Sequence, residues 1–168
     1  MSLPYVILTI LKDNDSTGYD VTKKLSGTIG LFWSASHQQV YRELNKMLKM
    51  SWVNSSFFPQ QGKPDKKIYS LTEMGVAELT KWVESPIKEQ VMRDELSLKI
   101  YAAQKINNQN IKKQLHQDLK KRQQELILLR KKGEQSSSLK PLDELYIKRN
   151  LYVLEADIKW IKQAILIL

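Results

Sequence analysis

The sequence contains no cysteine and only two histidines, His37 and His116, which lie far apart. Without cysteine the chain has no disulfide, no thiolate zinc site and no cysteine nucleophile. Apolar runs also fall short of the roughly 18 to 20 residues that a membrane-spanning helix needs. The opening residues lack the basic segment typical of a secretory signal. From these absences we expect a cytoplasmic protein with no membrane partner and no metal site.

Motifs of common catalytic sites are absent as well. The sequence has no glycine-rich phosphate loop, no nucleophile elbow, no H-E-x-x-H segment and no paired carboxylates. Acidic residues such as Glu43, Glu73, Asp94 and Glu95 are more typical of charges on helix surfaces. We therefore expect a protein that is not an enzyme and that has no cofactor.

The charge balance points to an anionic partner. Of the 168 residues, 42% are hydrophobic and 27% are charged, which is the composition of a folded chain, and the net charge is +9. Such a basic balance is typical of proteins that bind nucleic acid or a membrane surface. The excess lies mainly in residues 86–168, with 17 Lys or Arg against 10 Asp or Glu. It therefore cannot by itself argue for DNA binding by the first half.

Residues 1–85 contain short elements with clear start signals. Apolar residues at helical spacing run from Leu3 to Leu11 and predict a first helix. Thr17–Asp20 and Ser36–Gln39 both fit the capping box, in which a hydroxyl accepts a hydrogen bond from a free amide of the first helical turn. These two segments predict the starts of a second and a third helix.

Two strand-like segments follow the third helix. Trp52–Phe58 is rich in aromatic side chains, and Lys66–Leu71 alternates between polar and apolar residues. A turn is predicted between them, and Thr72 is placed to cap a fourth helix. The order helix, helix, helix, strand, turn, strand, helix is that of a winged helix-turn-helix. A small α+β domain without nucleic-acid function would show the same order.

The texture of the sequence changes near Ser85 and Pro86, and the residues after this point form long, charged segments with a helical pattern. We therefore predict two domains, a winged helix-turn-helix over residues 1–85 and a helical domain over residues 86–168. The predicted fold class is mainly α with a small β wing, followed by a C-terminal antiparallel helical dimerisation arm.

Three stretches resemble the PadR family of bacterial transcriptional regulators. They are Gly18–Asp20, Trp33–Leu44 and Gly62–Gly75, and their order and spacing make the resemblance specific. Residues 86–168 are similar to the helical C-terminal region of the virulence-activator-type branch of this family. The resemblance implies a homodimer that binds double-stranded operator DNA, usually as a repressor. Many members of the family release DNA when a small aromatic or cationic effector binds. Ser51 departs from the family, which usually has glycine there, and this puts the local turn in doubt.

The predicted third helix carries hydrogen-bond donors on its outer face. Glutamine pairs with adenine and arginine with guanine when a helix lies in the major groove. A plain solvated helix face is the alternative. The candidate DNA-binding residues on this helix and at its start are Ser36, His37, Gln38, Gln39, Tyr41, Arg42 and Asn45.

The predicted turn between the two strands adds basic side chains. A two-stranded ribbon with Lys63, Lys66 and Lys67 near its tip could contact the minor groove or adjacent phosphates. Alternatively, these lysines protect an edge hairpin from aggregation.

The last helix has an apolar stripe whose spacings alternate between four and three residues, typical of left-handed coiled-coil packing. We expect this stripe to form the homodimer, although helices that fold back and leave a monomer are the alternative. A symmetric dimer predicts a palindromic operator. The role of the basic stretch 105–132 stays open. The predicted dimerisation residues are Ile147, Leu151, Leu154, Ile158, Ile161, Ile165 and Leu168.

Two functions remain for comparison. The first is a sequence-specific DNA-binding transcriptional regulator, acting as a homodimeric repressor on a palindromic operator. The second is a winged-helix protein-interaction module without specific DNA binding. Donors on the outer face of the third helix, with Gln38, Arg42 and Asn45 all present, favour the first.

Overall fold

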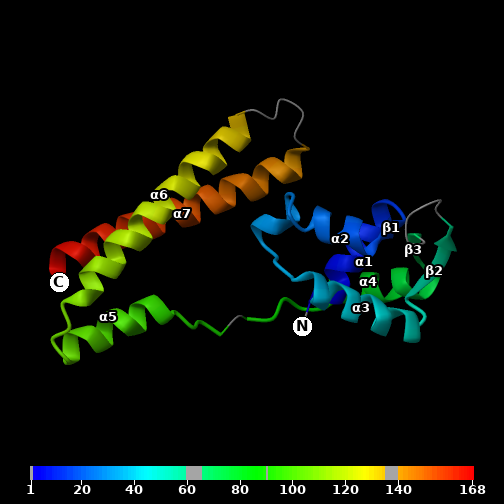
Figure 1. Ribbon diagram of the computed structural model, residues 1–168, viewed down its shortest axis with the longest axis horizontal. Coiled ribbons are helices and arrows are strands. Elements are labelled where there is room, and N and C mark those ends of the chain that lie inside the picture. Colours follow the sequence, from blue (N-terminus) through cyan, green and yellow to red (C-terminus); the bar gives the residue numbers. More distant parts are fainter. Residues whose placement is uncertain (1, 60–65, 90, 135–139) are drawn as a thin grey trace. The chain divides into compact units, whose positions relative to one another are not determined.

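A computed structural model describes residues 2–59, 66–89, 91–134 and 140–168 (Figure 1). The chain forms two compact units, Met1–Lys88 and Glu89–Leu168. Each unit has its own buried core, and the two are described separately.

The N-terminal unit is a helical domain with a small antiparallel sheet of strand order β1-β3-β2. The predicted order of helices and strands is confirmed. The two-residue strand β1 and a short 3-10 helix at Ile29–Leu31 were not predicted from the sequence. The elements are α1 (Leu3–Asp13), β1 (Ser16–Thr17), α2 (Gly18–Lys24), α3 (His37–Lys49), β2 (Val53–Phe58), β3 (Lys66–Leu71) and α4 (Glu73–Glu84).

The core of this unit lies between α1, α2 and α3. Ile7 and Leu8 of α1 meet Val40, Leu44 and Met47 of α3, and all five side chains are 0% exposed. Burying an aliphatic side chain of this size contributes about 1.5–3 kcal/mol. Because one face of α3 is buried in this core, its opposite face is exposed to solvent.

Both predicted capping boxes are present. At α2 the Thr17 hydroxyl accepts from the Asp20 amide at 3.1 Å, and the Thr17 amide donates to the Asp20 carboxylate at 3.1 Å. The Thr17 hydroxyl and amide lower the pKa of the Asp20 carboxyl. At α3 the Gln39 amide donates to Ser36 Oγ at 3.3 Å, and the Ser36 amide donates to Gln39 Oε1 at 2.8 Å. Local sequence therefore fixes where both helices of the helix-turn-helix begin.

The turn after α3 has a left-handed residue at Ser51, with φ of 58°. The Trp52 amide donates to the Met47 carbonyl at 2.9 Å, and the Ser51 amide donates to the Leu48 carbonyl at 3.1 Å. This is the Schellman arrangement, in which glycine is usual because a Cβ is unfavourable at positive φ. The turn that Ser51 put in doubt is therefore formed.

Replacing Ser51 with glycine is expected to raise the free energy of unfolding by about 0.5–1 kcal/mol, because the left-handed backbone loses its Cβ penalty. Met50, one residue earlier, has φ of −86°, so Met50→Gly is a matched control that should destabilise. Urea unfolding followed by circular dichroism measures both. Equal losses of stability in the two variants would contradict strain at Ser51.

The C-terminal unit consists of α5 (Glu95–Lys105), α6 (Asn110–Glu134) and α7 (Pro141–Ile167). Helices α6 and α7 run antiparallel along their length (Figure 1). Near the start of α6, Ile111 and Leu115 pack with Ile161 of α7 and with Ala103 of α5. This cluster joins all three helices.

The apolar stripe predicted for dimerisation has a partner within the chain. Ile147, Leu154, Ile158 and Ile161 are at most 9% exposed in a single chain, on the face of α7 that packs against α6. The 3.5-residue repeat of α7 thus packs against α6 of the same chain. A direct role for these side chains between subunits stays a prediction, and their burial makes them poor candidates for it.

Ion pairs connect α6 to α7 beside this buried face. Arg122 donates to Asp118 on its own helix at 2.8 Å and also to Asp157 of α7. Arg130 donates to Glu155 at 2.7 Å. Partial burial opposes the charge of Arg122, but Asp118 and Asp157 outweigh it and raise the Arg122 pKa. These pairs favour a single register of α6 on α7.

Helix α7 has a second apolar stripe, on the side opposite α6, which sequence analysis did not predict. Side chains three and four residues apart share a helix face. The residues of this outer stripe, all exposed in the single chain, are Leu142, Leu145, Tyr152, Val153, Ala156, Trp160 and Ile167.

Candidate nucleic-acid interface

The outward face of α3 carries the predicted base-contacting side chains. Gln38, Arg42 and Asn45 are exposed and lie opposite the buried Val40 and Leu44. Lys49 continues the same exposed face one turn later. The structure therefore brings three of the predicted residues together in one donor-rich row.

Ser36 and Gln39 have a different local role. Their side chains are engaged in the capping box at the start of α3. His37, the first residue of α3, is exposed next to this capping box. Backbone amides at such a helix start favour an anion, so a phosphate contact remains consistent with these positions.

Tyr41 lies on the side of α3 that faces α2. A Cβ built on Gly18 would lie 2.6 Å from Tyr41 Cε1, so the tyrosine ring packs on the start of α2 where only glycine fits. The ring is still 43% exposed. Tyr41 therefore packs α3 against α2, while part of its ring stays accessible to solvent.

Tyr19 is a further exposed aromatic side chain beside this surface. Its ring is 61% exposed and lies 6.4 Å from the His37 ring, centroid to centroid. The two side chains come from the first turns of α2 and α3. Tyr19 thus extends the outward surface of α3 toward α2.

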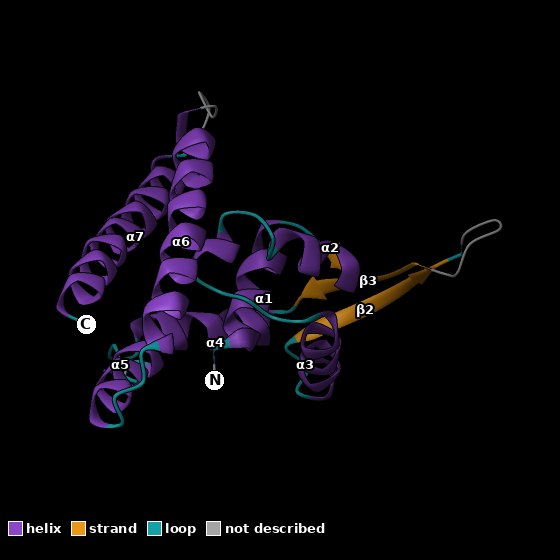
Figure 2. Cartoon of the chain, turned by 60° about the vertical axis from the view of Figure 1, so that its left-hand side comes forward, coloured by secondary structure: helices purple, strands orange, loops and turns teal. Residues whose placement is uncertain are grey.

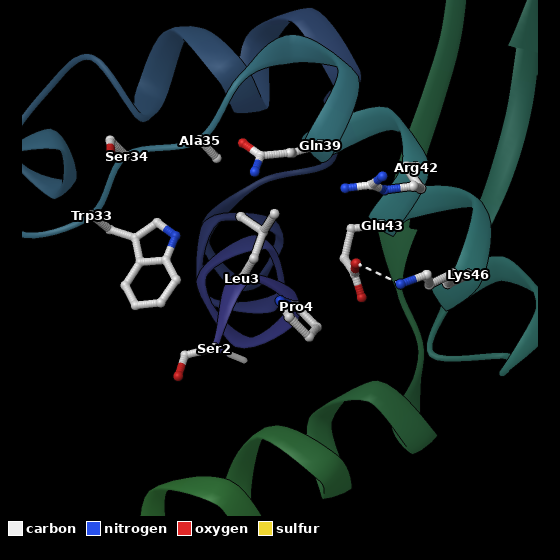
Figure 3. A pocket seen from close by; sticks show the side chains of 10 residues that line it. All are labelled: Ser2, Leu3, Pro4, Trp33, Ser34, Ala35, Gln39, Arg42, Glu43 and Lys46. Atoms are coloured by element: carbon white, nitrogen blue, oxygen red, sulfur yellow. Dashed lines mark hydrogen bonds and ion pairs between the residues drawn. The ribbon is translucent and has the colours of Figure 1, made fainter. Parts of the chain in front are cut away.

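A pocket of about 410 Å³ lies along one flank of α3 (Figure 3). Its walls come from the start of α1, from residues 33–35 and from α3. Lys46 on this flank pairs with Glu43 at 3.3 Å. Arg42, at the border between the pocket and the outward face, donates no hydrogen bond to any of the described residues. Arg42 is therefore a cation with space to reorient toward a ligand.

The wing, defined here as the β2–β3 ribbon, projects away from the helices of the N-terminal unit (Figure 2). Lys66 is exposed, whereas the Lys67 amine lies 5.3 Å from the centre of the Phe57 ring and 5.2 Å from that of Tyr69. Lys63 lies outside the described residues. Two of the three predicted lysines are thus on the wing, and one of them rests on aromatic rings.

Phe57 and Phe58 were predicted to lie in a strand but not to form part of the candidate interface. Their side chains are 64% and 51% exposed at the end of β2. The sequence does contain a signal for their exposure, which is the presence of two adjacent aromatic residues in a strand. Consecutive strand residues point to opposite faces, so a core on one side of the sheet cannot bury both.

The described ranges contain no cluster of three or more His, Asp or Glu side chains that could hold a metal ion. None of their helices is both long and apolar enough to span a membrane.

Comparison with known protein families finds two matches along the chain. Residues 7–81 match the transcriptional regulator PadR-like family. Residues 92–168 match the virulence activator alpha C-terminal family. The two matches fall in the N-terminal and the C-terminal unit, respectively.

Individual relatives agree with these matches. The chain is 36% identical over 126 residues to the negative transcriptional regulator PadR of Bacillus subtilis, which covers 74% of this chain and 69% of that protein. It is 41% identical over 87 residues to the probable transcriptional regulator Rv1176c of Mycobacterium tuberculosis. That second match covers 52% of this chain and only 46% of the mycobacterial protein.

Solved structures resemble the whole chain. Bacillus subtilis PadR in complex with operator DNA superposes with a TM-score of 0.84, 30% identity and 99% coverage of both chains. The Vibrio cholerae virulence activator AphA superposes with a TM-score of 0.82 and 34% identity, over 98% of this chain and 96% of that one. The expectation of a regulator rather than an enzyme is confirmed, and the chain belongs to the PadR-like family of transcriptional regulators.

Proposed function

We propose that this protein binds operator DNA sequence-specifically, with α3 in the major groove and the wing beside it. The observation that carries the proposal is the row of exposed donors on α3, set opposite a fully buried face. The relative solved with operator DNA, Bacillus subtilis PadR, supports it. Under this proposal the N-terminal domain, residues 1–85, binds DNA, and a cytoplasmic location follows from that partner.

Each donor has a defined task in this proposal. Arg42 pairs with guanine, and Gln38 and Asn45 pair with adenine, at about 1–3 kcal/mol of discrimination for each good bidentate contact. The start of α3, with Ser36, His37 and Gln39, lies against a backbone phosphate. The remaining proposed contacts are Tyr41, Lys63, Lys66 and Lys67, which hold phosphates and orient the domain without selecting sequence.

Arg42→Ala is expected to weaken binding to a selected duplex by roughly 5- to 100-fold and to relax one base position, since a bidentate contact is lost. Arg42→Lys keeps the charge but cannot form that contact, so it should lose the base preference with little change in salt dependence. Fluorescence anisotropy on duplexes with single base-pair changes measures both. If Arg42→Ala bound its site as tightly as the wild type, the assignment of α3 would be wrong.

We further propose that residues 86–168 form a homodimer through the outer stripe of α7. After α6 and α7 have packed together, Tyr152, Trp160 and Ile167 remain exposed along α7 at 68%, 39% and 81%. Exposed apolar surface of this extent marks an interaction site. A symmetric pair of subunits presents two copies of α3 and so favours a palindromic operator.

A small-molecule effector is the third part of the proposal. Bacillus subtilis PadR has also been solved with p-coumaric acid, and that structure superposes on this chain with a TM-score of 0.76 and 28% identity. We propose that this protein is a repressor released from DNA by a small aromatic or cationic compound. Adding p-coumaric acid to the protein–DNA complex should reduce anisotropy in a saturable way. No change at millimolar acid would exclude this compound and leave DNA binding untouched.

A further inference from the structure

Strand β2 of the wing ends in two aromatic side chains that the N-terminal core does not use. Val53, at the start of β2, is 1% exposed and packs in the core, whereas Phe57 and Phe58 at the other end are 64% and 51% exposed. The two ends of β2 differ in exposure because the ribbon extends past the helices that cover its base (Figure 2). Exposed aromatic surface on a projecting ribbon is unfavourable in water and indicates a contact outside the chain.

Strand pairing gives each phenylalanine a lysine neighbour. Phe57 is opposite Lys67 and Phe58 is opposite Lys66 in the antiparallel register. Because adjacent residues alternate across the ribbon, one Phe–Lys pair lies on each of its two faces. The Lys67 amine, 5.3 Å from the centre of the Phe57 ring, shows that the two groups of one pair are in contact. Each face of the ribbon thus combines an aromatic ring with a lysine amine.

DNA offers surfaces of matching chemistry. The walls of the minor groove are deoxyribose rings, which are largely apolar, and each wall is lined by phosphates. Proteins that enter this groove commonly place apolar side chains against or between the sugars and base edges. A ribbon with one Phe–Lys pair on each face can contact both walls at once. Its positive charge argues against a second copy of this basic chain as the occupant.

We propose that Phe57 and Phe58 enter the minor groove next to the major-groove site of α3, where their rings contact deoxyribose and base edges while Lys66 and Lys67 neutralise the flanking phosphates. This proposal rests on the proposed DNA binding and adds the apolar half of the wing contact. It also makes the wing sensitive to groove width, and so to A·T content outside the bases that α3 contacts.

The apolar contact has a thermodynamic signature different from that of the lysines. Removing a phosphate contact lowers the salt dependence of binding, because one fewer counterion is released. Removing an apolar contact weakens binding and leaves the salt dependence as it was. The double variant Phe57→Thr/Phe58→Thr keeps residues suited to a strand. It is expected to bind a selected duplex about tenfold more weakly, with an unchanged slope of log affinity against log salt.

Two further variants make the comparison specific. Lys66→Ala should reduce the salt slope by about one. Met74→Ala removes another apolar side chain, 54% exposed on α4, and should change neither affinity nor slope. Thermal unfolding of all variants within about 2 °C of wild type excludes a structural effect. An affinity loss below twofold in the double variant overturns the proposal, as does a loss accompanied by a smaller salt slope.

A second measurement compares the wild type and the double variant in the presence of a minor-groove ligand. Netropsin occupies the minor groove of A·T tracts, so netropsin bound to A·T flanks should weaken wild-type binding several-fold and leave the double variant unaffected. Equal effects on both proteins would overturn the proposal. A change in self-association of the double variant, measured by sedimentation, would also overturn it and would assign the rings to a protein contact.

If the wild type binds no duplex specifically, the proposed DNA binding itself fails. That result is distinguishable from failure of the minor-groove contact alone.

Discussion

Replacing Ile161 with aspartate is expected to unfold the C-terminal unit. Ile161 is 0% exposed and packs in the cluster that joins α5, α6 and α7. A carboxylate there loses the apolar contacts and buries an unpaired charge, which together cost about 4 kcal/mol or more. The helices of this unit, of 11, 25 and 27 residues, are joined by this cluster. The remaining buried contact between α6 and α7 is the stripe that includes Ile147, Leu154 and Ile158.

Far-UV circular dichroism measures this effect directly. The variant should lose about half or more of the helical signal, because α6 and α7 are the two longest helices of the described chain. The N-terminal unit has its own core and should keep its helices. A variant with wild-type helicity and melting temperature would contradict the burial of Ile161 against α6.

Replacing the neighbouring Trp160 with aspartate is expected to separate the proposed dimer and leave the fold intact. Trp160 lies one residue away on the outer stripe of α7 and is 39% exposed in the single chain. An exposed carboxylate on a monomer surface costs little, but the same charge in a contact between subunits is desolvated on both sides. Sedimentation equilibrium should therefore show a monomer, with unchanged helical circular dichroism.

The pair of variants separates the two faces of α7. Ile161→Asp tests packing within the chain, and Trp160→Asp tests contact between chains. Loss of the dimer should also weaken operator binding by more than any single base contact, because one of two half-sites is lost. A Trp160→Asp protein that stays a dimer would remove the outer stripe from the proposal.

Local signals explain why parts of the fold could be predicted from the sequence. The starts of α2 and α3 were predicted correctly because Thr17, Asp20, Ser36 and Gln39 satisfy each other's amides within three residues. The pattern of buried residues on α3 was predictable for a similar reason, since it depends only on the helical period.

Features that depend on distant partners were harder to predict. Strand β1 has only two residues, Ser16 and Thr17, and exists because it pairs with Tyr69 and Ile68 far along the chain. The antiparallel pairing of the two long helices was predicted, but the apolar repeat of α7 could not show whether its main contact is α6 of the same chain or a second subunit. Tyr41 was predicted as a contact residue, and only the close approach to Gly18 shows that it also joins α2 to α3.

The proposed DNA recognition is tested most directly by selecting binding duplexes from a random library at near-physiological salt and sequencing them. Two copies of α3 related by the dimer axis predict an enriched two-fold symmetric motif, with A·T-rich positions where the wings lie. Enrichment that Arg42→Ala shifts at a single base position in each half-site would assign that position to α3. Recovery of no motif, with only salt-sensitive bulk binding, would contradict sequence-specific recognition by α3 and favour a role in protein contact.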